Sequence, residues 1–489
     1  MAGGGLAAPA TISGVIRNRS PWPLFSLIVP LVFVLGCTEG GDQPSCRDGL
    51  AFEHVGVIDG LGNPPLEDQT VAVCDGRIAV LAASTEARVP RGAKAVDMSG
   101  RWIVPGFVDM HAHVTMLPFD SQGGLVSEMS WADSEHALRT LVAFGVTTVR
   151  NPAAPAAEGV ALREAVASGE LVGPRILTAG EALNPREADY GPFVAVPDEA
   201  SVRAEVARQA EIGVDYIKAY AALPPELLAI VVEAAHAHGL EVIAHLQRTD
   251  WTEAARLGVD QIAHGAPWST SYLPAEAQAG YRGTFKGRMD WLEQVDFDGP
   301  PIQEMLTELV EHGVSIDPTL LAYRTKFFGD DPRHTQHPEM DLAPPTVREQ
   351  WQLATFTDDW TAADYARGHA VWPRMLEFTR RLYEGGVFLT AGSDLPNPWV
   401  IPGVSLHEEL QLLADAGIPP LEVLKIATWN GARALGLDEE VGSVEVGKRA
   451  DLVILAANPL RMLANTRAIE LVLLDGKPYS PGVLLTSGS

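Results

Sequence analysis

One arrangement of residues recurs along most of this chain: a helix-like stretch, a glycine, a short apolar run and then a polar residue. The glycines stand where a helix would stop and a strand begin: Gly213, Gly239, Gly258 and Gly386. The apolar runs that follow them end in Lys218, His245, His264 and Asp394. Such alternation is typical of a parallel α/β fold, whose functional groups gather at the C-terminal ends of the strands. We therefore expect these polar side chains to share one pocket.

Two further histidines, His111 and His113, follow an apolar run that extends from Trp102 to Val108. In an extended strand, residues i and i+2 project to the same face, so both imidazoles can reach one metal ion. Two polar residues that merely end a strand would show the same spacing. The polar residues at the other strand ends favour the metal site.

Several short motifs follow one another along the chain: PGFVDMHAH, GVTTVR, GPRIL, EAAHAHGLEVIAH, GVDQIAHG, DPTL, AGSD and ATWNGARALGL. In their order and spacing they resemble the amidohydrolase superfamily, specifically its imidazolonepropionase-like and prolidase-like metal-dependent hydrolases. The resemblance extends from about Phe52 to Tyr479. It implies an α/β fold, a (β/α)8 TIM-like barrel with a small β-sandwich domain formed by both chain ends.

The resemblance and the composition together predict five segments. They are a lipoprotein-type signal peptide at 1–36, a tether at 37–49, the N-terminal part of the β-sandwich at 50–104, the barrel at 105–437 and the C-terminal part of the β-sandwich at 438–489. The tether is rich in glycine and polar residues, which suits a short flexible connection. A chain of 489 residues is long enough for one large barrel and a smaller module.

The resemblance also implies a set of metal ligands. By position these are His111, His113, Lys218, His245, His264 and Asp394. Lys218 would bridge two divalent ions after carboxylation by carbon dioxide, because an ordinary protonated lysine, with a pKa near ~10.4, is a poor ligand. The alternative for Lys218 is a structural cation that pairs with an acid. Mixed nitrogen and oxygen ligation suits zinc, while manganese, iron and cobalt stay open.

This set of ligands predicts hydrolytic chemistry. Two closely spaced cations lower the pKa of a bridging water from ~15.7 toward neutrality, and one of them polarises the scissile carbonyl. Asp394 is the candidate catalytic residue, which would take the proton of the water and pass it to the leaving group. Tyr220 and Arg248, which follow Lys218 and His245 closely, are candidates to hold a substrate carbonyl or carboxylate.

The longest irregular stretches come after His264 and after Thr319, where loops that follow barrel strands would build specificity. They carry aromatic residues: Trp268, Tyr272, Trp291, Phe327, Phe328, Trp351 and Trp360. These residues either pack a lid against the barrel or face the ligand as an apolar wall. The segment EALNPREADYGPFV and Asn151 depart from the common pattern of the superfamily, so a relative's substrate does not transfer directly.

The N-terminus looks like a bacterial lipoprotein signal. Arg17 and Arg19 precede the apolar stretch PLFSLIVPLVFVLG, and Cys37 follows it as the expected site of lipidation. An uncleaved transmembrane anchor is the alternative, but a span needs roughly 20 apolar residues. This stretch is shorter and contains Pro30. We expect an extracytoplasmic protein of the bacterial cell envelope, attached to the membrane by its lipid alone.

Two cysteines remain after Cys37. An exported protein permits a disulfide between Cys46 and Cys74, although Cys74 fits equally well as a small buried residue. The 36 basic and 63 acidic residues give a net charge of −27. This charge opposes binding to nucleic acids and to a broad anionic membrane surface. The expected partner is a small-molecule substrate, and self-association stays open.

The predicted function is metal-dependent hydrolysis of a C–N bond in a small substrate. By resemblance, a dipeptide with a C-terminal proline or basic residue, or an N-acyl amino acid, is the leading class. A cyclic-amide hydrolase or a deaminase of the same superfamily is the first alternative. The second is a non-catalytic lipoprotein that binds small molecules, a reading that the loss of a ligand would favour.

Overall fold

The computed structural model of the protein describes residues 46–116, 129–186, 192–353 and 357–486. The expected signal peptide at 1–36, its Cys37 and most of the tether lie outside the described residues. Among the helices that the structure describes, none is long and apolar enough to cross a membrane.

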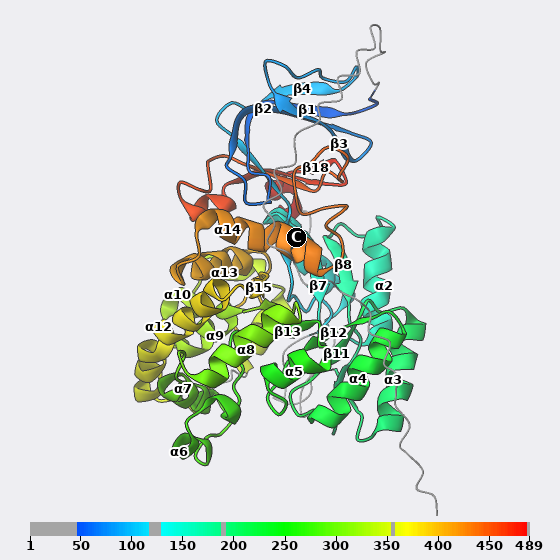
Figure 1. The fold of residues 1–489 in the computed structure, drawn as a ribbon. Helices are drawn as coiled ribbons and strands as arrows, with labels where there is room; N and C mark the ends of the chain where they lie inside the picture. The colour runs from blue at the N-terminus through cyan, green and yellow to red at the C-terminus, as the bar shows by residue number, and fades with distance from the viewer. Residues whose placement is uncertain (1–45, 117–128, 187–191, 354–356, 487–489) are drawn as a thin grey trace, which may run out of the picture. The chain divides into compact units, whose positions relative to one another are not determined.

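Strands from both ends of the chain share one sheet of eight strands, in the order β18-β17-β16-β5-β1-β2-β3, with β4 paired to β1. The N-terminal strands are β1 (Leu50–Val57), β2 (Leu66–Cys74), β3 (Arg77–Ala83), β4 (Lys94–Asp97) and β5 (Trp102–Pro105). The C-terminal strands are β16 (Leu452–Leu455), β17 (Ile469–Leu474) and β18 (Lys477–Tyr479). The two ends join where β5 runs antiparallel to β16, with Val104 opposite Val453. Figure 1 shows these first and last strands, blue and red, close together.

A disulfide joins Cys46, just before β1, to Cys74 at the end of β2. The two Cα atoms are 5.5 Å apart and the cysteines are separated by 28 residues. Of the two readings of Cys74, the structure therefore has the disulfide.

We expect Cys74→Ser to lower the free energy of unfolding by about 3 kcal/mol, because the disulfide removes chain entropy from the unfolded state. Urea denaturation with and without a reducing agent measures the effect. The reductant should lower the stability of the wild type to that of the variant and should leave the variant unchanged. Equal stability of both oxidised proteins would show that the disulfide contributes nothing.

The central part of the chain alternates parallel strands with helices. Its strands are β6 (Phe107–Asp109), β7 (Val146–Asn151), β8 (Arg175–Thr178), β9 (Ala182–Asn184), β10 (Phe193–Ala195), β11 (Tyr216–Ala219), β12 (Glu241–Ala244), β13 (Gln261–Ala263), β14 (Ser315–Asp317) and β15 (Phe388–Leu389). They form a three-stranded sheet, β6-β7-β8, and a seven-stranded sheet, β10-β9-β11-β12-β13-β14-β15. All pairs in both sheets are parallel, which confirms the predicted α/β class. Isolated parallel bridges join Ala112 to Leu395 and Ala179 to Tyr216.

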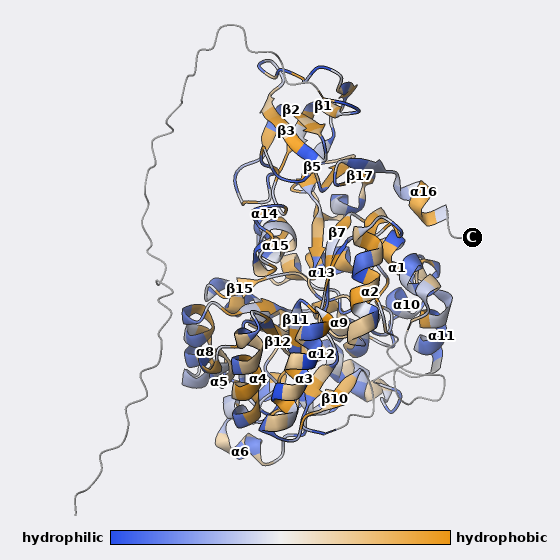
Figure 2. Cartoon of the chain, turned by 90° about the vertical axis from the view of Figure 1, so that its right-hand side faces the viewer, coloured by the Kyte–Doolittle hydropathy of each residue, from blue (hydrophilic) through white to orange (hydrophobic). Residues whose placement is uncertain are grey.

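Helices connect these strands and surround them. The main ones are α1 (Trp131–Ala143), α2 (Ala156–Ala167), α3 (Glu199–Ile212), α4 (Pro225–Ala237), α5 (Trp251–Leu257), α8 (Pro300–Glu311), α12 (Ala362–Glu384) and α13 (Val404–Asp415). After α13 come α14 (Pro420–Lys425), a π-helical segment (Ile426–Asn430), α15 (Gly431–Ala434), a short 3-10 helix (Leu463–Arg467) and α16 (Pro481–Thr486). In Figure 2 hydrophobic residues are concentrated on the strands, whereas helices such as α3 also carry hydrophilic ones.

The glycines of the repeated pattern end helices as predicted. Helix α3 ends at Gly213 and α5 at Gly258, with φ values of 95° and 89°. A residue with a Cβ is disfavoured in this left-handed conformation, so each glycine stops its helix one short turn before the next strand. These helix ends determine where β11 and β13 lie in the chain, and hence the positions of Lys218 and His264.

The two stretches that look irregular in sequence contain short helices. These are a 3-10 turn (Thr270–Tyr272), α6 (Ala275–Gln278), α7 (Phe285–Gln294), α9 (Leu320–Phe327), α10 (Pro332–Thr335), a second 3-10 turn (Met340–Leu342) and α11 (Pro345–Leu353). Most of their aromatic residues are buried in the protein interior: Trp268, Tyr272, Trp291, Phe327 and Trp351. Of the two readings of these aromatics, packing therefore holds for most of the set.

Candidate functional site

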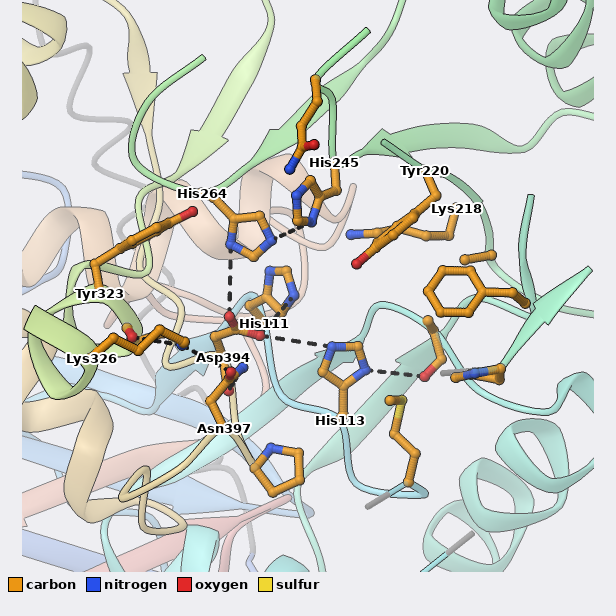
Figure 3. A pocket seen from close by; sticks show the side chains of 18 of the residues that line it. His111, His113, Lys218, Tyr220, His245, His264, Tyr323, Lys326, Asp394 and Asn397 are labelled. Atoms are coloured by element: carbon orange, nitrogen blue, oxygen red, sulfur yellow. Dashed lines mark hydrogen bonds and ion pairs between the residues drawn. The ribbon is translucent and has the colours of Figure 1, made fainter. Parts of the chain in front are cut away.

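The six residues predicted to bind metal line one cavity of about 160 Å³ (Figure 3). They are His111, His113, Lys218, His245, His264 and Asp394. The two histidines of the HAH segment follow β6, Lys218 stands within β11, and His245 and His264 come directly after β12 and β13. Asp394 lies in the loop that follows β15. Side chains at the ends of parallel strands thus converge, as the repeated pattern predicts.

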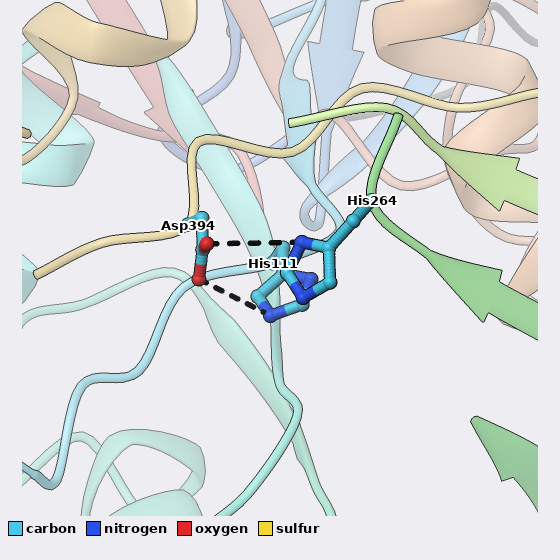
Figure 4. A group of neighbouring side chains, drawn as sticks. All are labelled: His111, His264 and Asp394. Atoms are coloured by element: carbon cyan, nitrogen blue, oxygen red, sulfur yellow. Dashed lines mark ion pairs between the residues drawn. The ribbon is translucent and has the colours of Figure 1, made fainter. Parts of the chain in front are cut away.

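Asp394 is the centre of the closest group of side chains (Figure 4). Its Oδ1 is 3.4 Å from Nε2 of His111, and its Oδ2 is 3.8 Å from Nδ1 of His264. One potential ligand atom from each of these three residues lies within 4.8 Å of the others, and all three residues are buried. Nε2 of His113 is 3.8 Å from the same Oδ1. Imidazole nitrogens and a carboxylate at this spacing are a donor set that divalent metals accept.

A buried carboxylate sets the orientation of His111. Nδ1 of His111 lies 2.8 Å from Oδ1 of Asp317, the last residue of β14. Oδ2 of Asp317 accepts a hydrogen bond of 2.6 Å from Nη2 of Arg150 in β7. This contact leaves Nε2 of His111 free to face Asp394, the arrangement that commonly orients histidine ligands of metals.

Sequence reasoning assigned no role to Asp317 or Arg150. Both stand inside motifs that support the superfamily resemblance, DPTL and GVTTVR. The motifs could have marked them, but their mutual contact and their contact with His111 depend on the order of strands in the sheets.

A second buried acid, Asp109, connects the HAH segment to the loop that carries Asp394. It accepts hydrogen bonds from Oγ and N of Ser393, at 2.6 and 3.0 Å, and from N of His111 at 3.1 Å. The backbone N–H of Asp394 in turn donates to the carbonyl of His111 at 2.7 Å. Burial raises the pKa of Asp109 to about 6. These bonds hold Asp394 close to the two histidines that follow β6.

The other two histidines contact each other in the cavity wall. Nε2 of His264 is 2.9 Å from Nδ1 of His245, and Nδ1 of His264 is 2.9 Å from Oγ1 of Thr319. Burial holds the pKa values of His111, His245 and His264 well below the ordinary range. The imidazoles are therefore neutral at physiological pH, which is the state that binds a metal ion.

Lys218 is buried in the same wall, and its Nζ has no hydrogen-bond partner among the described residues. Burial lowers the pKa of Lys218 to about 8, so the neutral amine is accessible near physiological pH. The described part of the chain also offers it no carboxylate at ion-pair distance, which argues against the structural-cation alternative. Nε2 of His245 is a second buried atom that lacks a partner there. Unpaired buried polar atoms are costly, so both atoms fit a site built for a further group.

The two residues predicted to contact the substrate lie in different places. Tyr220 lines the cavity, with its ring centroid 4.8 Å from that of His245. Arg248 does not reach this cavity: it is exposed and lines a separate surface hollow beside Gln247. The reason is a turn after β12, where the N–H of Arg248 bonds to the carbonyl of Ala221 and the side chain is directed outward. Arg248 therefore lies outside the wall of this cavity, and its role as a substrate contact stays a prediction.

The cavity wall also contains residues that sequence reasoning missed: Arg288 from α7, Tyr323 and Lys326 from α9, and Asn397. Nζ of Lys326 donates to the carbonyl of Ala322 at 2.7 Å and to Oδ1 of Asn397 at 3.0 Å. Burial lowers the pKa of Lys326 to about 7. No local signal distinguishes these residues from other cations and aromatics of the same segments.

Comparison with known proteins agrees with the geometry. The family model described as the amidohydrolase family matches residues 102–479. An uncharacterized protein of Mycobacterium tuberculosis is 26% identical over 442 residues, which cover 87% of this chain and 95% of that protein. The fold is similar to a Xaa-Pro dipeptidase with bound methionine in the active site, with a TM-score of 0.64, 21% identity and coverage of 88% and 100% of the two chains. It is also similar to bottromycin amidohydrolase, with a TM-score of 0.67, 24% identity and coverage of 89% and 88%.

The family match covers most of the chain, and it confirms the superfamily that the motifs indicate. Family membership implies the use of divalent metal ions, and the buried cluster of His111, His264 and Asp394 is consistent with it. The chain belongs to the amidohydrolase family, and membership of this family makes it a hydrolase of carbon–nitrogen bonds.

Proposed function

We propose that the protein hydrolyses the amide bond of a dipeptide or an N-acyl amino acid with the help of two divalent metal ions, preferably zinc. The observation that carries this proposal is the buried Nζ of Lys218, which has no hydrogen-bond partner among the described residues. It lies in a cavity that four histidines and an aspartate also line. Such a set suits an anionic carbamate on Lys218 and neutral imidazoles around it. When bound, two cations would supply ionised water at neutral pH and polarise the scissile carbonyl.

The six side chains would form the two sides of a site for two metal ions. His111, His113 and Asp394 form one side of the site, His245 and His264 the other, and a carboxylated Lys218 would connect the two. Both histidines of the second side are neutral because of their burial, so they are ready to act as ligands.

The chain's own acids would move and hold the protons. Asp394 would take the proton of the attacking water on a carboxylate oxygen and deliver it to the leaving nitrogen, since no other carboxylate of the described cavity wall lies as close to the histidines. Asp317 would hold the proton of His111 on Nδ1, which keeps Nε2 available. The hydroxyl of Tyr220 would orient the substrate carbonyl from the cavity wall.

We also propose that the two parallel sheets close into one (β/α)8 barrel. The bridge from Ala179 to Tyr216 connects β8 to β11, and the bridge from Ala112 to Leu395 connects the segments after β6 and β15. Closure of this kind brings strands that are far apart in sequence around one axis. It would explain why ligands from five strands meet in one cavity.

The direct test is a screen of the purified, metal-loaded protein against dipeptides and N-acyl amino acids. We expect amide hydrolysis that a chelator abolishes and added zinc restores. Ring opening of a cyclic amide would instead indicate a cyclic-amide hydrolase, and release of ammonia from an amino-substituted heterocycle would indicate a deaminase. Tight binding without turnover of any compound would favour a binding protein.

We expect Asp317→Asn to lower the affinity for metal by about 10- to 100-fold, because loss of the orienting carboxylate weakens a histidine ligand. Competition with a fluorescent chelator measures this affinity. Asp215→Asn is a matched control, since Asp215 pairs with Arg163 away from the cavity. Unchanged metal affinity in Asp317→Asn would show that His111 is oriented by other contacts.

We propose that the protein is exported and anchored to the bacterial cell envelope through a lipid on Cys37. The disulfide between Cys46 and Cys74 supports this proposal, because disulfides persist in oxidising compartments. The acidic net charge of −27 agrees with an attachment that does not use a basic surface.

Cys37→Ser is expected to move the protein from the membrane fraction to the soluble fraction, or to leave it unprocessed. A single acyl chain binds membranes only marginally, with an association constant on the order of 10⁴ M⁻¹, so stable attachment needs several chains. Cell fractionation and mass spectrometry of the N-terminal peptide measure both outcomes. An unmodified Cys37 in the native protein would contradict the anchor.

A further inference from the structure

Arg288 in α7 is a buried cation in the wall of the cavity. Arg288 is only 6% exposed, and its Nε has no hydrogen-bond partner in the part of the chain that the structure describes. Among the described residues no carboxylate lies at ion-pair distance from this guanidinium: the nearby Asp290 pairs instead with Arg367. An Arg side chain is always charged, so the site keeps a positive charge that lacks a counterion.

Three aromatic rings surround this guanidinium. Its Cζ lies 4.1 Å from the ring centroid of Phe285 and 5.4 Å from those of Trp268 and Tyr323. The indole of Trp268 donates to the hydroxyl of Tyr323 at 3.1 Å, so the rings also brace each other. Aromatic faces attract a cation but do not replace the hydrogen bonds that a planar guanidinium makes with an anion. The rings therefore hold Arg288 in place without supplying a hydrogen-bond acceptor to its Nε.

The position of Arg288 relates it to the proposed metal ligands. The Tyr323 ring that it contacts lies 6.2 Å, between centroids, from the ring of His264. Figure 3 shows Tyr323 and Lys326 on the side of the cavity that carries His264 and Asp394. Nζ of Lys326 lies 5.5 Å from the same Phe285 ring, so a second basic side chain is near Arg288 in this wall. An anion bound here would share the cavity with the proposed metal ligands.

We propose that Arg288 binds a free carboxylate of the substrate, which makes the substrate an amide whose amino-acid part retains its carboxyl group. This inference rests on the proposed function and specifies the substrate class for the same cavity. A guanidinium can take a carboxylate through two parallel hydrogen bonds, which would fix the orientation of the substrate as well as its charge. The same wall would repel a basic residue in the position beside Arg288. Of the substrates considered above, an N-acyl amino acid or a dipeptide with a neutral C-terminal residue fits this charge best.

The first experiment compares charged and neutral forms of one substrate. A panel of N-acetyl amino acids and dipeptides with neutral side chains is tested on the holoenzyme beside the C-terminal primary amides of the same compounds. We expect the acids to be cleaved with a kcat/KM about 10²-fold above that of the amides. Arg288→Met should lower kcat/KM for the acids by about 10²-fold and change that for the amides by less than about threefold. Equal losses for acids and amides would overturn the assignment.

Two further variants separate recognition from a merely structural role. Arg288→Lys keeps the charge without the planar fork and should restore part of the preference for acids. Arg282→Met is the matched control, because Arg282 is exposed and bonds only to the carbonyls of Ala279 and Tyr281. The melting temperature of Arg288→Met without substrate should equal or exceed that of the wild type, because the variant removes a buried charge that has no counterion. A clear fall in this melting temperature would mark Arg288 as a structural residue.

Calorimetric binding to Asp394→Asn holoenzyme distinguishes this inference from the proposed function. Preferential binding of the acids, lost when Arg288→Met is added, would support the carboxylate site even if no compound of the panel were hydrolysed. Hydrolysis without any preference for the acids would keep the proposed function and overturn the carboxylate site. Absence of binding for every acid of the panel would overturn it as well.

Discussion

Lys218→Ala is expected to abolish turnover, with kcat/KM lowered by about 10³-fold or more. The variant should also lower the metal content from two ions per chain to one or none. Lys218 is the side chain that would connect the two halves of the site, and its buried Nζ has no partner among the described residues. An alanine removes both the carbamate and the charge that it would bring to two cations.

Elemental analysis and steady-state kinetics measure this prediction together. Lys286→Ala is a suitable control, because Lys286 lies at the surface and pairs with Asp359 and Asp364. Native mass spectrometry of the wild type should show an added mass of one carbon dioxide, which is lost in Lys218→Ala. One tightly bound ion in fully active wild-type enzyme would refute the binuclear site and favour a mononuclear one.

Asp394→Asn is expected to lower kcat by about 10²-fold or more while the fold persists. Asparagine has nearly the same shape but cannot take up a proton, so the contacts with His111 and His264 survive better than the proton transfer. Single-turnover kinetics measure the loss, and far-ultraviolet circular dichroism checks the fold. The exposed Asp415 provides the matched control, Asp415→Asn. Unchanged turnover in Asp394→Asn would assign the proton transfer to another group.

The activity of the wild type should also fall on the acid side. Burial raises the pKa of Asp394 to about 7, and that of Asp317 likewise to about 7, so both carboxyl groups bind protons as the pH is lowered. A protonated Asp394 cannot accept the proton of the attacking water. Because these groups lie close together, the measured pKa belongs to the set and not to one residue.

The helix, glycine and strand pattern predicted the parallel α/β class and four residues of the cavity wall, and the spacing of the HAH segment predicted His111 and His113. This success has a local cause. The end of a buried strand is marked by its own sequence, and parallel strands place their C-terminal ends at one edge. Lys218, His264 and Asp394 could be singled out in this way without knowledge of which strands are neighbours.

The structure of the two stretches after His264 and after Thr319 was less predictable. Helices α7 and α9 occupy stretches that look irregular in sequence, because both helices are short and proline, glycine and acidic residues lie between them and their neighbours. Arg288 and Lys326 in these helices enter the cavity, whereas Arg248, which sequence proximity to His245 favoured, is directed outward. Distance along the chain was a poor guide where a turn reverses the direction of the side chain.

The sequence by itself determined the class of fold, the family and the residue types that meet in the site. Short motifs and hydrophobic periodicity indicate each of these features. Only the tertiary structure decided that Asp317 orients His111, that Nζ of Lys218 has no partner among the described residues, and that Arg288 is a buried cation without a counterion there. The reason is physical. Burial and pairing depend on which distant segments pack together, and long-range packing of this kind leaves no mark on the residues adjacent in sequence.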